Sequence, residues 1–313
     1  MDKVLITGAL GFIPSNLCEK LLERGYFVIG IDNNLTGSFE HIESFKNHSN
    51  FVFITGDVNN YNTLYELFYS FHPKYVFHYA ACVGVQRTLN NPMWVLNDIK
   101  GFENVMNLSR DFSVSRILFS SSSEVYGEPV EFPQDEQTTP LNSKLPYAVV
   151  KNIGEVYLKT YQHEYGLPYT IFRFFNTFGP KQATDFVVSK FINQALHNID
   201  ITIYGEGKQT RTFCYIDDNN EATINSLDKE GAINEVFNIG SNYEYTILEL
   251  AQIIIRLTDS TSKIVHLPAL KEGDMTRRKP SNDKMVKNLL GGRKLISTEE
   301  GLKRTIDYFK RKR

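Results

Sequence analysis

The first half of the chain alternates short, nearly continuous apolar runs with segments in which apolar residues recur every three or four positions. The apolar runs cover residues 3–7, 26–32, 51–57, 75–81, 116–122 and 169–175. The first recurring segment carries Ile13, Leu17 and Leu21, which is the spacing of one helix face. Such runs are typical of strands buried on both faces, so the pattern predicts a parallel sheet with helices on either side. Right-handed crossovers make the expected fold a Rossmann-type, doubly wound α/β sheet.

Beyond residue 176 the rhythm changes, because turn-rich stretches such as "FGPKQATD" and "YGEGKQTR" separate shorter elements. One more strand is expected at 236–240, returning to the sheet, and a helix is expected over 246–257. We therefore expect residues 1–175, joined by returning segments at about 213–257, to form one domain. The remaining segments, 176–212 and 258–313, are expected to form a smaller C-terminal lobe that closes over a ligand.

Composition and charge narrow the classes of partner. The 313 residues include 34 Lys and Arg and 36 Asp and Glu, a formal net charge of −2. A nearly neutral chain has no broad basic surface, which argues against nucleic acid and anionic lipid as partners. Cys18, Cys82 and Cys214 are far apart, so neither a metal site nor a disulfide framework is predicted. A strand begins directly after the N-terminus and no apolar run could span a bilayer, so we expect a cytoplasmic protein.

The stretch "TGALGFIPSN" at residues 7–16 lies between the first strand and the first helix, where a dinucleotide-binding loop belongs. Gly8 permits the tight turn, and Gly11 lets the backbone approach a pyrophosphate at the helix N-terminus. Pro14 stands where a third glycine is usual; because proline is tolerated in a first helical turn, we expect a small helix displacement and not a lost site. Asp32 ends the second strand, where a carboxylate binds ribose hydroxyls and repels a 2′-phosphate. Asn33 adds no cation, so NAD is predicted over NADP.

Four serines at 120–123 stand at the carboxyl end of a strand, where open α/β sheets bind ligands. A helix predicted to begin at Pro146 then carries Tyr147 and Lys151 four positions apart, on one face. Removing hydride from a carbinol carbon requires a base for the hydroxyl proton, and a neighbouring ammonium lowers the pKa of a phenol. Tyr147 is therefore the candidate general base, with Lys151 as its electrostatic activator and cofactor ligand. Ser122 is the candidate group that positions the substrate oxygen.

These motifs, together with "HYAACVGV", "RFFNTFGP" and "YGEGKQTRTFCYIDD", make the chain similar from end to end to the extended short-chain dehydrogenase/reductases. Within them it resembles the NAD-dependent nucleotide-sugar epimerase/dehydratase family, nearest in pattern to UDP-glucuronate decarboxylases and 4-epimerases. The resemblance implies an oxidoreductase that uses NAD to oxidise the C4 hydroxyl of a nucleoside-diphosphate sugar to a 4-keto sugar. It also implies an NAD-binding domain, a nucleotide-sugar-binding lobe, and a homodimer paired through the helix of Tyr147 and the long helix before it.

The same resemblance assigns further residues by position. Cofactor contacts are expected at Phe12, Ile13, Asp57, Val58, Ala80, Ala81 and Cys82. Substrate contacts are expected at Ser123, Asn176, Val187, Tyr204 and Arg211, with Asn176 and Arg211 on the diphosphate. A further phosphate-binding arginine is usual just before "GD" in the C-terminal lobe, where this chain has Lys271. Lys271 and Arg277 are the predicted substrate ligands of this segment, with the adjacent Arg278 as another candidate.

Two positions bear on the fate of the 4-keto intermediate. Ser123 stands where 4,6-dehydratases of the dTDP-glucose type have an aspartic acid, and Glu124 stands where dehydratases and UDP-glucuronate decarboxylases keep a glutamate. Glu124 is therefore a catalytic candidate that could take the C5 proton. Decarboxylation, 4-epimerisation, 4,6-dehydration and release of the keto sugar all stay open, as does the nucleobase. A non-catalytic NAD-binding sensor is a distant alternative, since a sensor need not keep the serines, Tyr147 and Lys151 together.

Overall fold

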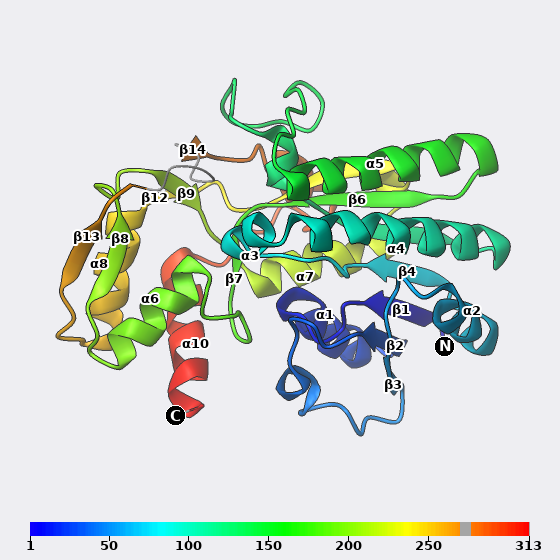
Figure 1. Cartoon of the computed structure of the whole chain (residues 1–313), viewed down its shortest axis with the longest axis horizontal. Coiled ribbons are helices and arrows are strands. Elements are labelled where there is room, and N and C mark those ends of the chain that lie inside the picture. The colour runs from blue at the N-terminus through cyan, green and yellow to red at the C-terminus, as the bar shows by residue number, and fades with distance from the viewer. Residues whose placement is uncertain (270–276, 313) are drawn as a thin grey trace.

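The computed structural model describes residues 1–269 and 277–312, and a seven-stranded parallel sheet lies at its centre (Figure 1). The strands are β1 (Lys3–Thr7), β2 (Phe27–Asp32), β3 (Phe51–Thr55), β4 (Tyr75–His78), β5 (Arg116–Ser122), β6 (Tyr169–Phe174) and β11 (Glu235–Ile239). Their order is β11-β6-β5-β4-β1-β2-β3, so β1 pairs with both β2 and β4 and the winding reverses beside it. The predicted Rossmann-type fold is confirmed, and its ligand crevice is expected beyond the carboxyl end of β1.

Helices cover both faces of this sheet and bury two separate apolar clusters. One face holds α1 (Phe12–Glu23) and α7 (Ile216–Asn225). The other holds α2 (Tyr61–Phe71), α4 (Pro92–Asp111) and α5 (Pro146–Tyr165). The long helices α4 and α5 lie side by side along the sheet (Figure 1). Burial on both faces explains why the strands are so uniformly apolar.

A second lobe lies beyond the carboxyl edge of the sheet and has its own apolar cluster (Figure 1). Its main elements are α6 (Val187–Leu196), β8 (Ile201–Tyr204), β9 (Thr210–Thr212), β12 (Glu244–Thr246), α8 (Ile247–Thr258), β13 (Ile264–Leu267), β14 (Arg277–Arg278) and α10 (Thr298–Arg311). The remaining elements are η1 (Phe39–Ile42), α3 (Val85–Asn90), η2 (Ser123–Tyr126), β7 (Thr177–Phe178), β10 (Cys214–Tyr215), η3 (Ser226–Asp228), η4 (Glu230–Ala232) and α9 (Asp283–Asn288).

The packing of α8 bears on where the two lobes divide. Leu250 and Ile254 of α8 are fully buried among residues of α6 and β8, including Phe191 and Ile203. By contrast, β11 pairs with β6 in the central sheet. These contacts favour a returning segment that ends near residue 240, where the expectation was about 257.

The helix that carries the candidate base is held tightly against the sheet. α5 begins with Pro146, whose missing N–H would be unpaired in a first turn, and its C-cap is Gly166 in the left-handed conformation. Gly154, in the middle of the helix, lies so close to its neighbours that an added Cβ would stand 2.6 Å from Cε1 of Phe102 and 2.7 Å from Cζ of Phe119. The absence of a side chain at this position lets α5 approach α4 and β5.

A buried ion pair links the same helix to two strands. Glu155 of α5 and Arg173 of β6 are joined by two charge-assisted bonds, Nε to Oε1 at 2.9 Å and Nη2 to Oε2 at 2.7 Å. Their side chains are 0% and 3% exposed. Ser121 of β5 donates its hydroxyl to Glu155 Oε1 at 2.6 Å, and Arg173 Nη1 donates to the hydroxyl of Tyr126 at 2.8 Å. The bonds of Glu155 with Arg173 and Ser121 stabilise α5 in one register on the serine strand.

We predict that Glu155→Gln lowers the free energy of unfolding by about 3–5 kcal/mol, because it leaves the Arg173 guanidinium buried without its counter-charge. Urea unfolding followed by circular dichroism measures this loss. The control is Glu43→Gln, which breaks an exposed pair with Lys46 and should change stability by less than about 1 kcal/mol. Equal losses in the free energy of unfolding for the two variants would contradict the stabilising role of the buried Glu155–Arg173 pair.

Candidate active site

One cavity of about 1170 Å³ opens at the carboxyl edge of the sheet, between the two lobes. It is lined by nearly all the residues predicted from the sequence: Gly8, Gly11, Phe12, Ile13, Asp32, Asn33, Asp57, Val58, Ala80, Ala81, Cys82, Ser122, Ser123, Glu124, Tyr147, Lys151, Asn176, Val187, Tyr204 and Arg211. These residues come from strand ends and helix starts that are far apart in the sequence. The fold therefore brings the candidate cofactor, redox and substrate residues into a single site.

The glycine-rich turn is shaped for close backbone approach. Gly8 has a positive φ of 74°, and an added Cβ would lie 2.9 Å from the backbone Cα of Ala80. At Gly11, an added Cβ would lie 3.1 Å from the carbonyl oxygen of Gly8. α1 begins directly afterwards, and its first residues, Phe12 and Ile13, line the cavity. No side chain caps this helix start, so the N–H groups of the first turn are available to a ligand. Pro14 is in the first turn and lines the same cavity, which is a position that proline tolerates.

Two carboxylates stand at the ends of neighbouring strands on the cofactor side. Asp32 accepts the N–H of Leu10 at 3.0 Å and the N–H of Asn34 at 2.7 Å. Burial raises the pKa of Asp32, and these two backbone bonds act against that rise. Asp57 accepts the side-chain amide of Asn33 at 3.1 Å. A crowded glycine turn at a helix start, followed by a carboxylate held by backbone amides, fits the diphosphate and ribose of NAD.

The serine strand, Tyr147 and Lys151 meet at the centre of the cavity. Lys151 is 3% exposed, and its amine donates to the carbonyl of Ser120 at 2.6 Å and to the Ser120 hydroxyl at 3.3 Å. It lies 5.8 Å from the centroid of the Tyr147 ring. Burial lowers the pKa of Lys151 to about 8, and the charge of Asp98 on α4 acts against this fall.

The lowered pKa that the sequence led us to expect for Tyr147 is not found in the structure. Burial raises the pKa of Tyr147, and the charges of Glu124 and Asp98 raise it further. A hydrogen bond with Ser122 and the charge of Arg278 lower it. The pKa is raised and not lowered because the phenol is desolvated, and this effect outweighs that of nearby cations. The extent of burial cannot be predicted from the motif spacing in the sequence. At neutral pH the resting group is therefore a neutral phenol.

Glu124 is paired across the cavity with an arginine from the other lobe. Arg278 Nη1 donates to Glu124 Oε1 at 2.9 Å and to the Ser123 hydroxyl at 3.4 Å. The side chains are 8% and 19% exposed. The Ser122 hydroxyl accepts the N–H of Glu124 at 3.2 Å, so this pair adjoins the serine that faces Tyr147.

Arg277 does not reach the site, and Arg278 takes its place. The Arg277 guanidinium makes two bonds to Glu244, at 2.6 and 2.7 Å, and stacks 4.4 Å from the Phe132 ring centroid. Arg277 is absent from the cavity lining, whereas Arg278 belongs to it. The two residues are consecutive in β14, so their side chains point to opposite sides. Lys271, the other predicted ligand of this segment, lies outside the described residues.

At the substrate end, polar and aromatic groups from the second lobe face the cavity. Asn176 donates to the carbonyl of Thr212 at 3.2 Å, and Arg211 donates to the carbonyl of Thr210 at 2.8 Å. Tyr204 ends β8, and the amine of Lys190 lies 5.7 Å from its ring centroid. The sequence reasoning missed Lys190 and Asp98, which both line the cavity. An acidic residue in the interior of a predicted helix was the available signal for Asp98.

Metal ions and membranes have no identified place in the described part of the chain. No three His, Cys, Asp or Glu side chains come together there in a way that could hold a metal ion. Cys18, Cys82 and Cys214 are free and buried. No helix among the described residues is both long and apolar enough to cross a bilayer.

Comparison with known proteins agrees with this geometry. Residues 4–240 match the NAD dependent epimerase/dehydratase family. The chain is 36% identical to a UDP-N-acetyl-alpha-D-glucosaminuronate decarboxylase from Bacillus cytotoxicus, covering 98% of both chains, and 34% identical to a UDP-glucuronate 4-epimerase from Thermodesulfobacterium geofontis, covering 99% and 97%.

Two similar solved structures are the Thermotoga maritima UDP-glucose 4-epimerase with UDP-glucose and the Bacillus cereus UDP-glucuronic acid 4-epimerase with UDP-glucuronic acid and NAD. The first has a TM-score of 0.92, 32% identity and 99% coverage of both chains. The second has a TM-score of 0.91, 29% identity and coverage of 99% and 100%. The chain belongs to the NAD-dependent epimerase/dehydratase family, and NAD is its cofactor.

Proposed function

We propose that this protein oxidises the C4 hydroxyl of a nucleoside-diphosphate sugar to a 4-keto sugar. The observation that carries the proposal is the meeting of Ser122, Tyr147 and Lys151 in the same cavity as the glycine turn and Asp32. Bound NAD would supply the acceptor for the C4 hydride. A protein that only sensed NAD would have no need for a phenol, an amine and a hydroxyl buried together at the sheet edge.

The residues of this chain can transfer the proton of the C4 hydroxyl. Ser122 is hydrogen-bonded to Tyr147, so a sugar hydroxyl that approaches the phenol can also contact the serine. Oxidation requires the phenolate form of Tyr147, which arises when the phenol releases its proton to solvent. Lys151, whose pKa of about 8 leaves it mostly protonated at pH 7, stabilises this phenolate. The phenolate then accepts the proton of the C4 hydroxyl and becomes the phenol again. In the reverse direction the neutral phenol is already the form that returns a proton to a 4-keto oxygen. A raised Tyr147 pKa thus suits a cycle in which the ketone is reduced again within the same site.

We expect Tyr147→Phe to reduce turnover by at least about 100-fold, because the substitution removes the proton-transferring hydroxyl and little else. Purified protein is incubated with UDP-, GDP- and dTDP-sugars, and product masses distinguish loss of carbon dioxide, water or hydrogen from isomerisation. The control is Tyr161→Phe on the same helix, whose hydroxyl donates to Asn107 of α4 and does not line the cavity. NAD binding by isothermal calorimetry should be equal in both variants. Unchanged turnover in Tyr147→Phe would refute the assigned base.

A carboxylated sugar is the substrate class that the Glu124–Arg278 pair favours. A guanidinium buried beside the redox centre can exchange its bond to Glu124 for a bond to a substrate carboxylate, and such bonds are stronger than neutral ones. The relatives named as a decarboxylase and as 4-epimerases of uronic acid nucleotides support this assignment. A C6 carboxylate beside a 4-keto group is a β-keto acid, which either loses carbon dioxide or is reduced on the opposite face. Decarboxylation and epimerisation are therefore the two outcomes we favour.

The adjacent arginines give a matched test of this substrate class. Arg278→Gln should lower kcat/KM for a UDP-hexuronate by a factor of about 100 or more, which is about 3 kcal/mol or more at 1.4 kcal/mol per tenfold, and should lower it much less for the neutral UDP-hexose. Arg277→Gln, which among the described residues loses contacts with Glu244 and Phe132, serves as the control and should retain the preference. Equal losses for charged and neutral sugars would contradict carboxylate recognition by Arg278.

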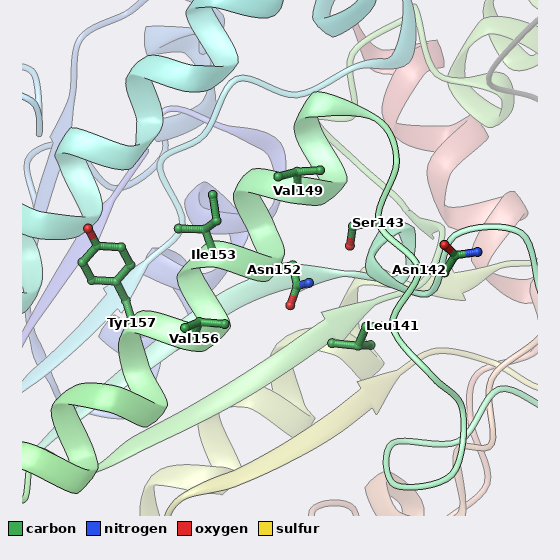
Figure 2. A pocket seen from close by; sticks show the side chains of 8 residues that line it. All are labelled: Leu141, Asn142, Ser143, Val149, Asn152, Ile153, Val156 and Tyr157. Carbon is green, nitrogen blue, oxygen red and sulfur yellow. The ribbon is translucent and has the colours of Figure 1, made fainter.

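Homodimerisation through α4 and α5 is part of the same proposal. A second cavity, of about 370 Å³, lies beside α5 and is lined by Val149, Ile153 and Val156 of the helix and by residues 141–143 of a nearby loop. Figure 2 shows these side chains. Val156 is 57% exposed, and Leu96 of α4 is 42% exposed. Apolar groups of this size on two adjacent long helices suit a contact with a second copy of the chain.

We predict a dimer by light scattering at micromolar concentration and a monomer for Val156→Glu, because a carboxylate buried in an apolar contact loses its hydration. Ile199→Glu places the same charge at an equally exposed position outside α4 and α5 and should leave the dimer intact. A monomeric wild-type protein, or an unaffected Val156→Glu dimer, would contradict this interface.

A further inference from the structure

Asp98 occupies an unusual position for an acidic residue. It lies in α4 beyond the first turn, so the helix dipole does not explain it, and it lines the cavity together with Tyr147 and Lys151. Aspartate is also an unfavourable residue in a helix interior. Its carboxylate Oδ2 accepts the backbone N–H of Cys82 at 2.9 Å. This bond joins α4 to the segment after β4 that runs along the cofactor side of the cavity.

The hydrogen bond alone does not require a charge, because an asparagine oxygen would accept the same N–H. The charge has a second partner. Lys151 is buried, and its amine bonds two neutral oxygens of Ser120. Asp98 is the acidic group whose field opposes the effect of burial on that amine.

We propose that Asp98 is a positioning residue of the redox centre, whose carboxylate anchors the cofactor-facing segment at Cys82 and supplies a negative charge to the cavity that the buried amine of Lys151 also lines. The name redox centre rests on the function proposed above, while both contacts are properties of the folded chain. Asp98 is not a catalytic residue in this proposal, because it acts through Lys151 and through the backbone of Cys82.

The surrounding groups leave Asp98 and Lys151 to control the charge of this region near neutral pH. Burial raises the pKa of Asp98 to about 6, with the Cys82 bond and Lys151 acting against the rise and Asp57 adding to it. His78, from β4, is neutral throughout this range because burial lowers its pKa to about 3. Tyr147 from α5 is a neutral phenol, and Arg87 from α3 acts on the Cys82 thiol. Between about pH 6 and pH 8 the carboxylate and the ammonium are therefore charged together.

The sign of the expected effect follows directly. A lysine pKa held up by a negative charge falls when that charge is removed, so Asp98→Asn should make Lys151 lose its proton at lower pH. The Tyr147 pKa should fall as well, because Asp98 also raises it. Activity that depends on the ammonium would then decline at a lower pH on the alkaline side.

Two variants separate the charge from the anchor. Asp98→Asn removes the charge and keeps an acceptor for Cys82, whereas Asp98→Glu keeps the charge. In protein labelled with 13C at lysine Cε, the resonance that disappears in Lys151→Gln identifies Lys151, and its titration gives the midpoint without turnover. We expect the midpoint to fall by about one pH unit in Asp98→Asn, and to stay near the wild-type value in Asp98→Glu. Asp111→Asn, at the exposed end of the same helix, is the control and should not move it.

Hydrogen exchange tests the anchor separately. The Cys82 amide should exchange faster in Asp98→Ala, which has no acceptor, and at nearly the wild-type rate in Asp98→Asn. A Lys151 midpoint unchanged in Asp98→Asn would overturn the electrostatic role, and unchanged Cys82 exchange in Asp98→Ala would overturn the anchor. Neither readout requires the protein to turn over a sugar, so failure here is distinguishable from failure of the proposed function. Circular dichroism of each variant verifies that the fold is intact.

Discussion

The site depends on the buried bonds that join Glu155 to Arg173 and Ser121. Glu155 lies one helical turn beyond Lys151 on α5, and Ser121 lies between Ser120 and Ser122 on β5. A carboxylate that accepts from both the helix-facing serine and the β6 guanidinium leaves little freedom for α5 to slide along the strand. The distances that matter for proton transfer are thus set in part by Glu155 and Arg173, which do not line the cavity. Buried charges of this kind are costly unless fully bonded, and here each carboxylate oxygen has a partner.

Exclusion of water from the same region governs the chemistry of the site. Burial lowers the pKa of Lys151 and raises that of Tyr147. At neutral pH Tyr147 is therefore in the neutral form that burial favours, whereas Lys151 is mostly in the charged form that burial disfavours. Fixed charges from neighbouring elements then adjust each group, Asp98 from α4 and the Glu124–Arg278 pair from η2 and β14. A charge in such surroundings acts more strongly than on the surface, because little solvent lies between it and its target.

The sequence was informative where local rules determine the outcome. Uniformly apolar runs marked all seven strands of the parallel sheet, and the glycine turn, Asp32 and the Tyr147–Lys151 spacing pointed to one cavity. It was uninformative where the answer depended on which way a side chain faces. Arg277 and Arg278 are equivalent in composition, and only the register of β14 against β9 decides that Arg278 turns inward. The pKa of Tyr147 likewise follows from its burial, which motif spacing does not contain.

Arg173 illustrates a signal that was present in the sequence and can be interpreted only with the fold. An arginine inside the apolar run "YTIFRFF" predicts a buried partner, but the partner, Glu155, lies 18 residues earlier on a helix. The parts of the site that this buried pair fixes are the ones that the proposed C4 oxidation needs. The Glu124–Arg278 pair is different, because it is more exposed and joins the two lobes across the cavity. A solved structure with a TM-score of 0.92 and 32% identity is named a 4-epimerase, and a relative at 36% identity is named a decarboxylase, so the shared fold alone does not determine the reaction.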